Sequence, residues 1–160
     1  MNEKLRNWVA IGELVAAAGV MISLIFVGYE LNSGNKIQQA ANDNFLYELQ
    51  DELYADLSTN PVLISAYTKL SNGDEELTRQ EAAQYVWYIW RYVNQLSMAF
   101  DRHAEGLLSD STWAAWSTSF ESELVGNSTG MSKERWESGR NTYRAEFTAY
   151  VDNLYLRLEN

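Results

Sequence analysis

The sequence predicts an all-α fold: one N-terminal transmembrane helix followed by an acidic amphipathic helical bundle. Three observations support this fold class. Residues 8–29 form an apolar stretch with a single charge. The rest of the 160-residue chain repeats apolar residues every three or four positions and holds only one proline. Asp and Glu outnumber Lys and Arg by 22 to 12, for a net charge of -10. We divide the chain into a polar tail at 1–7, a transmembrane helix at 8–31 and a helical bundle domain at 32–160.

The apolar stretch, WVAIGELVAAAGVMISLIFVGY, is long enough to cross a bilayer. At about 1.5 Å per residue it spans roughly 33 Å, which matches a hydrocarbon core of about 30 Å. Trp8 and Tyr29 lie at its ends, where aromatic side chains favour the membrane interface. A cleaved signal peptide has a shorter apolar region and a small-residue cleavage site, and a buried soluble helix needs a larger domain around it. We therefore expect a retained span in membrane lipid.

One face of this span is lined by small residues at alternating spacings of four and three: Gly12, Ala16, Gly19 and Ser23. Small residues let helix backbones approach closely in lipid, so this face is a candidate for packing against another span, in a homo-oligomer or with a protein partner. Small residues are also frequent in spans of every kind, and both interpretations remain open. The intramembrane carboxylate Glu13 has three interpretations: reaching back to the interface or protonation there, pairing with a partner chain, or transport chemistry.

The charges that flank the span bear on its orientation. Lys4 and Arg6 precede it, and Lys36 follows it. The positive-inside rule then leans towards a cytoplasmic N-terminus by a single charge, and the side of the C-terminal domain stays open. We expect a bacterial inner (cytoplasmic) membrane protein with a single pass.

The first predicted helices of the domain follow the span. Asn32, Ser33 and Gly34 either end the apolar helix or are crossed by it. An amphipathic helix is predicted over 37–57, with Phe45, Leu49 and Leu53 facing inwards. Asn60 and Pro61 read as an N-cap and first helical residue, and they begin a short helix that ends near Leu70 in a turn at 71–74.

The longest helix of the domain is predicted to begin at a capping box formed by Thr78 and Glu81. Its apolar seam comprises Ala82, Val86, Ile89, Val93, Leu96 and Phe100, with an adjacent stripe of Tyr85, Tyr88 and Tyr92. Because aromatic residues widen its apolar surface, we expect this helix at the centre of the bundle.

Two further helices complete the predicted bundle. The first begins at Ser109, ends at 126–130 and has as its inward residues Trp113, Trp116, Phe120 and Leu124. The second is capped by Ser132 and has as its inward residues Trp136, Tyr143, Phe147, Tyr150, Val151 and Leu154. We predict one continuous helix for this last segment.

The aromatic residues also suggest a ligand pocket. Its candidate lining is Trp87, Trp90, Arg91, Trp113, Trp116 and Trp136. Aromatic walls bind flat organic ligands, but a bundle core needs large residues at such positions as well, and core packing is the stronger interpretation.

The residue inventory excludes several chemistries. The chain has no cysteine, which removes thiol nucleophiles and Cys-ligated metal sites, and its one histidine, His103, lacks partner ligands. We interpret His103 as a cation at a helix C-terminus. The net charge of -10 argues against nucleic acid as a partner. We expect no catalytic, cofactor-binding or metal-binding residue, no cofactor, and no enzyme.

The chain resembles a family of small single-pass membrane proteins of marine and environmental proteobacteria that has no established activity. The resemblance covers most of the chain and is carried by residues 8–15 and 23–31, by 106–108 with Trp113 and Trp116, and by Trp136 with 147–152. It implies a membrane helix with a helical domain. Relatives usually carry Gln-Ile-Arg-x-Asn after the span, where this chain has Glu30-Leu31-Asn32-Ser33-Gly34 and therefore lacks the basic flank that favours a cytoplasmic domain.

Two function classes follow from these features. In the first, the protein is a membrane-anchored, non-catalytic interaction or accessory subunit that joins a homo-oligomer or larger complex through the small-residue face. In the second, it is a membrane-tethered sensor or binding module whose Trp/Tyr-rich interior holds a small hydrophobic or aromatic ligand or a lipid.

Overall fold

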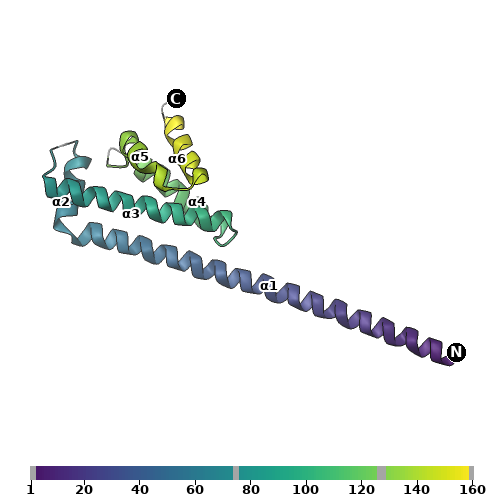
Figure 1. Ribbon diagram of the computed structural model, residues 1–160. Helices are drawn as coiled ribbons and strands as arrows, with labels where there is room; N and C mark the ends of the chain where they lie inside the picture. Colours follow the sequence, from purple (N-terminus) through teal and green to yellow (C-terminus); the bar gives the residue numbers. More distant parts are fainter. Residues whose placement is uncertain (1–2, 74–75, 126–128, 159–160) are drawn as a thin grey trace. The chain divides into compact units, whose positions relative to one another are not determined.

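The computed structural model describes residues 3–73, 76–125 and 129–158, and the regular secondary structure of these residues is entirely helical (Figure 1). The elements in chain order are α1 (Glu3–Thr59), α2 (Pro61–Ser71), α3 (Arg79–Ala104), α4 (Asp110–Phe120), a π-helical turn (Glu121–Val125), α5 (Lys133–Gly139), a 3-10 turn (Arg140–Thr142) and α6 (Ala145–Leu158). The predicted all-α class is confirmed.

The chain divides into two compact units, Met1–Gln38 and Gln39–Asn160. Helix α1 contributes to both, because it continues without a break through Asn32, Ser33 and Gly34. Of the two alternatives that the sequence left open at this point, the structure has the continuous helix. The predicted boundary between the transmembrane helix and the bundle domain lies between residues 31 and 32. The second compact unit begins at Gln39, seven residues after the predicted start of the bundle.

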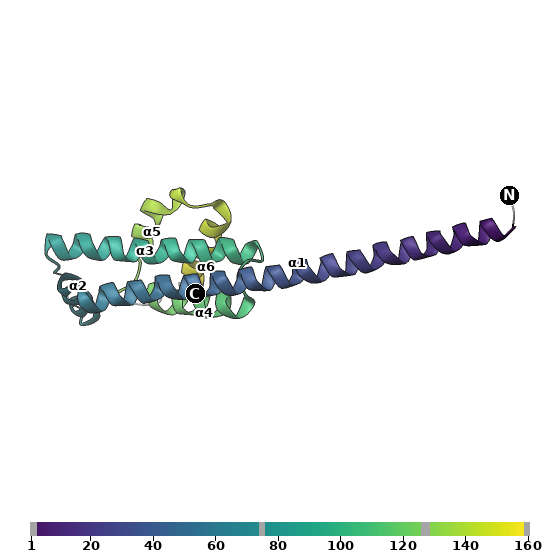
Figure 2. The same ribbon diagram turned by 90° about the horizontal axis from the view of Figure 1, so that it is seen from below.

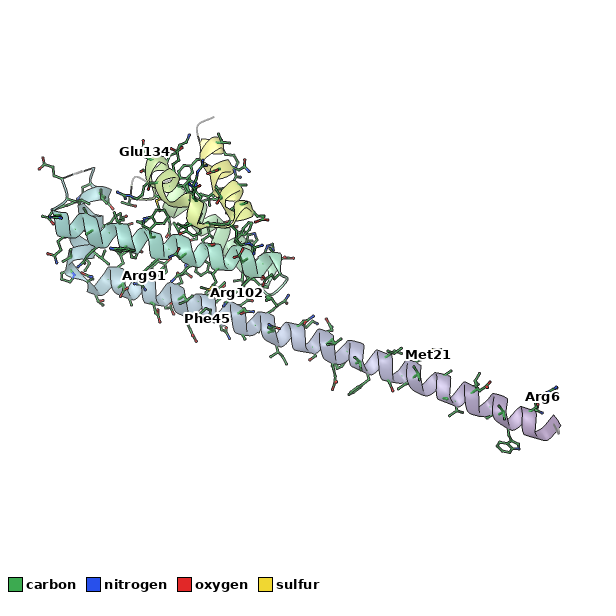
Figure 3. The ribbon with its side chains drawn as sticks, viewed as in Figure 1. Arg6, Met21, Phe45, Arg91, Arg102 and Glu134 are labelled. Atoms are coloured by element: carbon green, nitrogen blue, oxygen red, sulfur yellow. The ribbon has the colours of Figure 1, made fainter. Side chains whose placement is uncertain are left out.

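In the first unit, the described side chains from Arg6 to Gln38 are all exposed, including the large apolar ones such as Met21 (Figure 3). Helix α1 contains an 18-residue window with a mean hydropathy of 2.2. No residue of that window is buried by the rest of the described chain. One helix of the protein is therefore long and apolar enough to cross a membrane.

In the second unit, α3 occupies the centre. It runs back alongside residues 39–59 of α1, and it also packs against α2, α4 and α6 (Figures 1 and 2). The main core includes Leu53, Leu63, Ile89, Val93, Leu96, Phe120, Trp136, Phe147 and Val151. A smaller cluster lies where α1, α3 and α4 meet and comprises Leu46, Ala99, Leu108 and Trp116.

The buried faces of α1 and α3 differ in detail from the predicted ones. Phe45 is 39% exposed, whereas Leu46 is fully buried, so the inward seam of α1 passes through Leu46 and Leu53. The prediction that Phe45 faces inwards is therefore wrong. Its ring lies instead 4.7 Å from the guanidinium of Arg102, a cation–π distance (Figure 3).

At the start of α3, the buried face is rotated by about one residue from the predicted apolar seam. Tyr85 is 3% exposed, whereas Ala82 and Val86 are only half-buried. The later seam residues Val93 and Leu96 are buried as predicted. The tyrosine stripe therefore belongs to the covered surface of α3.

The predicted single last helix is wrong, because α5 and α6 are separated by the 3-10 turn and by Tyr143, whose backbone is extended. Two contacts explain the break. Gly139 lies against the indole of Trp90, so close that an added Cβ would come within 2.6 Å of Trp90 Cζ2. Trp136 Nε1 donates to Asp152 Oδ1 at 2.7 Å, which requires α6 to turn back towards α5.

The capping box predicted at the start of α3 is present, and it also joins α3 to α2. The Thr78 backbone N–H donates to Glu81 Oε2 at 2.7 Å, and the Glu81 N–H donates to Thr78 Oγ1 at 3.2 Å. Two side chains of α2 donate to the same carboxylate: Ser65 Oγ at 2.6 Å and Lys69 Nζ at 2.8 Å. These donors, with Lys69 first, lower the pKa of the buried Glu81 from its ordinary value of 4.5 to about 2.

The loop between α3 and α4 is held by polar side chains from one face of α1. Gln39 Nε2 donates to the carbonyl of Gly106 at 2.8 Å, and Asn42 Nδ2 donates to the carbonyl of Leu107 at 3.0 Å. Asp43 accepts from Ser109 Oγ at 2.9 Å. Gly106 has a φ of +72°, the left-handed conformation that ends α3. These bonds fix the loop where the second compact unit begins.

Gly139→Ala should destabilise the domain by about 1–3 kcal/mol, because the new methyl group overlaps the Trp90 ring. Urea unfolding measures this loss. Gly34→Ala is the matched control, since a Cβ there meets no atom within 4 Å. A second substitution, Trp90→Phe, should recover part of the loss in the Gly139→Ala background. Equal stabilities of Gly139→Ala and the wild type would contradict the packing.

Glu81→Gln should lower the free energy of unfolding at pH 7 and make this free energy less dependent on pH in the acid range. Because the folded protein lowers the pKa of Glu81, its contribution is present above the unfolded value of 4.5 and is lost as the pH falls towards 2. Urea unfolding at pH 7, 5, 4 and 3 should show the difference between wild type and variant narrowing with acid. Glu48→Gln, at an exposed position, controls for the change of charge. A difference that stays constant over this range would refute the role of the ionised carboxylate.

Candidate functional site

The structure brings together two of the six residues of the predicted ligand pocket. Trp87, which is 71% exposed, and the half-buried Trp90 line an open groove between α3 and α5. The groove has a volume of about 440 Å³ and ends on Gly139 and Tyr143. The ring of Trp90 stacks on that of Tyr143 with a centroid separation of 6.2 Å.

The other four residues do not line this groove, although Trp136 stacks on Tyr143 with ring centroids 5.6 Å apart. Trp113 stacks on His103 at 5.2 Å, and Trp116 is buried in the smaller core cluster. Trp136 is only 1% exposed within the main core. Arg91 is exposed and forms an ion pair with Asp56 of α1 (Figure 3). These side chains serve packing and helix pairing at separate places in the domain.

The candidate residues of the predicted transmembrane helix have no neighbours within the described chain that would cover them. A Cβ added at Gly12 or Gly19 would meet no atom within 4 Å, and Ala16 and Glu13 are exposed. Ser23 Oγ donates to the Gly19 carbonyl one turn earlier, at 2.9 Å. Its hydroxyl is thereby satisfied within the helix.

A different aromatic site appears where α1, α2 and α3 meet, and sequence reasoning missed it. A cleft of about 190 Å³ is lined by five tyrosines, Tyr54, Tyr67, Tyr85, Tyr88 and Tyr92. Leu57 and Ile89 add apolar surface, and Glu123 of the π-helical turn is the one charged residue among the described residues of the lining. We call this the tyrosine cleft.

Hydrogen bonds position three of the five tyrosine hydroxyls. Tyr85 donates to the backbone carbonyl of Thr129, and Tyr92 shares a hydrogen bond of 3.3 Å with Ser119 Oγ. The Tyr54 hydroxyl accepts from Gln50 Nε2 at 3.2 Å. The rings of Tyr85 and Tyr88 are tilted by 33° with centroids 6.1 Å apart, so they form two walls set at an angle. The lining is therefore held in place by hydrogen bonds within it, to Thr129, and by hydrogen bonds to Gln50 and Ser119 outside it.

The phenols of Tyr85, Tyr88 and Tyr92 are uncharged at neutral pH. Burial raises the pKa of both Tyr85 and Tyr92 to about 12, and it raises the pKa of Tyr88 further. The negative charge of Glu123 contributes to the raised pKa of Tyr88 and Tyr92. The cleft thus combines neutral aromatic rings with one carboxylate at its edge.

The sequence held only part of the signal for this site. Tyr85, Tyr88 and Tyr92 were recognised as a stripe on one helix, but Tyr54 and Tyr67 come from two other helices. Their convergence depends on the rotation of each helix about its axis, and a periodic pattern does not give that rotation. Elsewhere, the part of the chain that the structure describes holds no group of three His, Asp or Glu side chains able to bind a metal ion.

The fold and its surfaces define an all-α protein that has one helix long and apolar enough to span a membrane and a small tyrosine-lined cleft in its helical domain. Comparison of the chain with protein-family models, curated proteins and solved structures found no match.

Proposed function

We propose that the protein is a membrane-anchored, non-catalytic interaction or accessory subunit, held by residues 8–31 in a bacterial inner membrane. The observation that supports this function is the complete exposure of the apolar part of α1. An uncovered apolar surface of this length is unfavourable in water, and lipid or another span provides the cover that the described chain does not.

The proposal assigns the small-residue face to association within the membrane. Without a hydrophobic driving force between helices in lipid, association depends on close packing, which Gly12 and Gly19 permit. Both glycines have open space around them, so a second helix meets no obstacle from the described chain. The acidic helical domain then serves as the part that contacts a soluble partner or its own copies.

A second candidate function is a membrane-tethered binding module, and the tyrosine cleft favours it. The set of side chains that converge there differs from the tryptophan pocket expected from the sequence. A concave site with an aromatic lining and one charged group is the usual form of a small-ligand site.

Ile22→Arg should release the protein from membranes, because an arginine near the centre of a span costs about 2.5–3.5 kcal/mol. The matched control is Ile37→Arg, which changes an equally exposed isoleucine outside residues 8–31. Membranes from expressing cells are washed with high salt and alkaline carbonate, and the pellets are compared. We expect the wild type and Ile37→Arg in the pellet and less of Ile22→Arg there. Recovery of the wild type in the soluble fraction would disprove the anchor.

Gly19→Leu should weaken self-association or partner association, because a large side chain separates the helix backbones. Gly28→Leu is the matched control, since at about 3.6 residues per turn Gly28 lies on the far side of the helix from Gly19. The measurement is the mass of the complex in a mild detergent, together with cross-linking in membranes. A wild-type protein that stays a lone monomer, or equal effects of the two substitutions, would rule out association through this face.

A further inference from the structure

We propose that the tyrosine cleft binds a small organic cation, of the size and chemistry of a quaternary ammonium group. This inference rests on the second candidate function, the binding module, and names the ligand class of that site. It stands on three properties of the cleft: its aromatic lining, its charge and its size.

The aromatic lining provides the attraction. The face of an aromatic ring carries negative potential, and a cation within about 6 Å of the ring centroid is attracted to it. Tyrosines from α1, α2 and α3 surround one small space. Tyr85 and Tyr92 are buried, whereas Tyr54 and Tyr67 are 43% and 37% exposed, so the rings of Tyr54 and Tyr67 offer surface to a ligand.

The charges around the cleft favour a positively charged ligand. Among the described residues of the lining, Glu123 is the charged one and none is Lys or Arg; Arg135 lies outside the lining, close enough to Tyr85 to lower its pKa. The whole chain carries a net charge of -10, which raises the local concentration of cations and repels anions. A carboxylate or phosphate ligand would therefore meet Glu123 and no cationic side chain among the described lining residues.

The volume of the cleft and the oxygen ligands in its lining further restrict which cations can bind. At about 190 Å³ the cleft is smaller than the roughly 300–1,000 Å³ of pockets that hold drug-sized ligands. A hard divalent metal ion needs several oxygen ligands, and Glu123 provides the lining's one carboxylate. A compact organic cation with a methylated, weakly hydrated surface fits both the volume and the rings.

The test is a titration of the full-length protein with tetramethylammonium chloride and with choline, in a nonionic detergent free of ammonium groups. Calorimetry or the intrinsic fluorescence reports binding. We expect saturable binding of both cations, no equivalent signal from potassium chloride, and at least tenfold weaker binding of 3,3-dimethylbutanol, the uncharged analogue of choline. An alcohol that binds as tightly as choline, or no saturable binding of either cation, would overturn the proposal.

Variants of Tyr67 distinguish the contribution of the aromatic ring to cation binding from that of the hydroxyl group. Tyr67 is 37% exposed, so its replacement leaves the core intact. Tyr67→Leu should weaken binding about tenfold, whereas Tyr67→Phe, which keeps the ring, should bind within about twofold of the wild type. Tyr47→Leu makes the same change at an exposed tyrosine outside the cleft and should have no effect. Glu123→Gln should weaken binding of the cation and leave that of the alcohol unchanged. Equal effects of Tyr67→Leu and Tyr47→Leu would refute the site.

A trimethylammonium group occurs both on free solutes and on lipid headgroups, and competition distinguishes the two sources. Displacement of choline by phosphatidylcholine vesicles, but not by phosphatidylglycerol vesicles, identifies the headgroup; saturation unaffected by either identifies a free solute. Both results support the cation site. A protein that fractionates with membranes but binds neither cation refutes this inference alone, and a soluble protein that binds choline refutes the anchor alone.

Discussion

The structure of the domain depends on covering α3 from several sides. This helix carries apolar and aromatic residues round most of its circumference, and full burial of one such side chain contributes about 1.5–3 kcal/mol. Residues 39–59 of α1, together with α2, α4 and α6, provide the cover. The joint formed by Glu81 then keeps α2 and α3 in register, since its carboxylate accepts hydrogen bonds from both elements. The fold of the domain and the tyrosine cleft both depend on how much of the α3 surface the neighbouring helices cover.

The tyrosine cleft is the place where that cover is incomplete. Tyrosine suits such a position because its ring packs against the core while its hydroxyl finds a polar partner. Tyr85 and Tyr92 do this through Thr129 and Ser119, and their rings remain as lining. A core of Leu and Val would have closed the same space. The aromatic composition that first suggested a tryptophan pocket thus forms a cleft at the tyrosines, while Trp116 and Trp136 are buried in the core.

Local signals in the sequence predicted the starts of helices well. The N-cap at Asn60 and the capping box at Thr78 depend on residues within one turn of each other, so no tertiary information is needed. Features that depend on contacts between distant residues were not predicted. The break after Gly139 arises from Trp90, 49 positions earlier in the sequence. Periodicity placed Phe45 inwards although Leu46 is the buried residue, because the apolar face of α1 is wide enough to allow either rotation.

The anchor and the cation site, both proposals, reinforce each other physically. A membrane with anionic lipids has a surface potential of about -30 mV, which concentrates a monovalent cation about threefold near the surface. The same potential repels a domain with a large negative charge, so electrostatics alone would not hold this domain at such a membrane. An apolar helix that belongs to the same chain and inserts into the bilayer overcomes that repulsion, since insertion of a span is far stronger than the adsorption of a charged surface. A domain of this acidic composition therefore stays at such a membrane only with an anchor of the kind that we propose for α1.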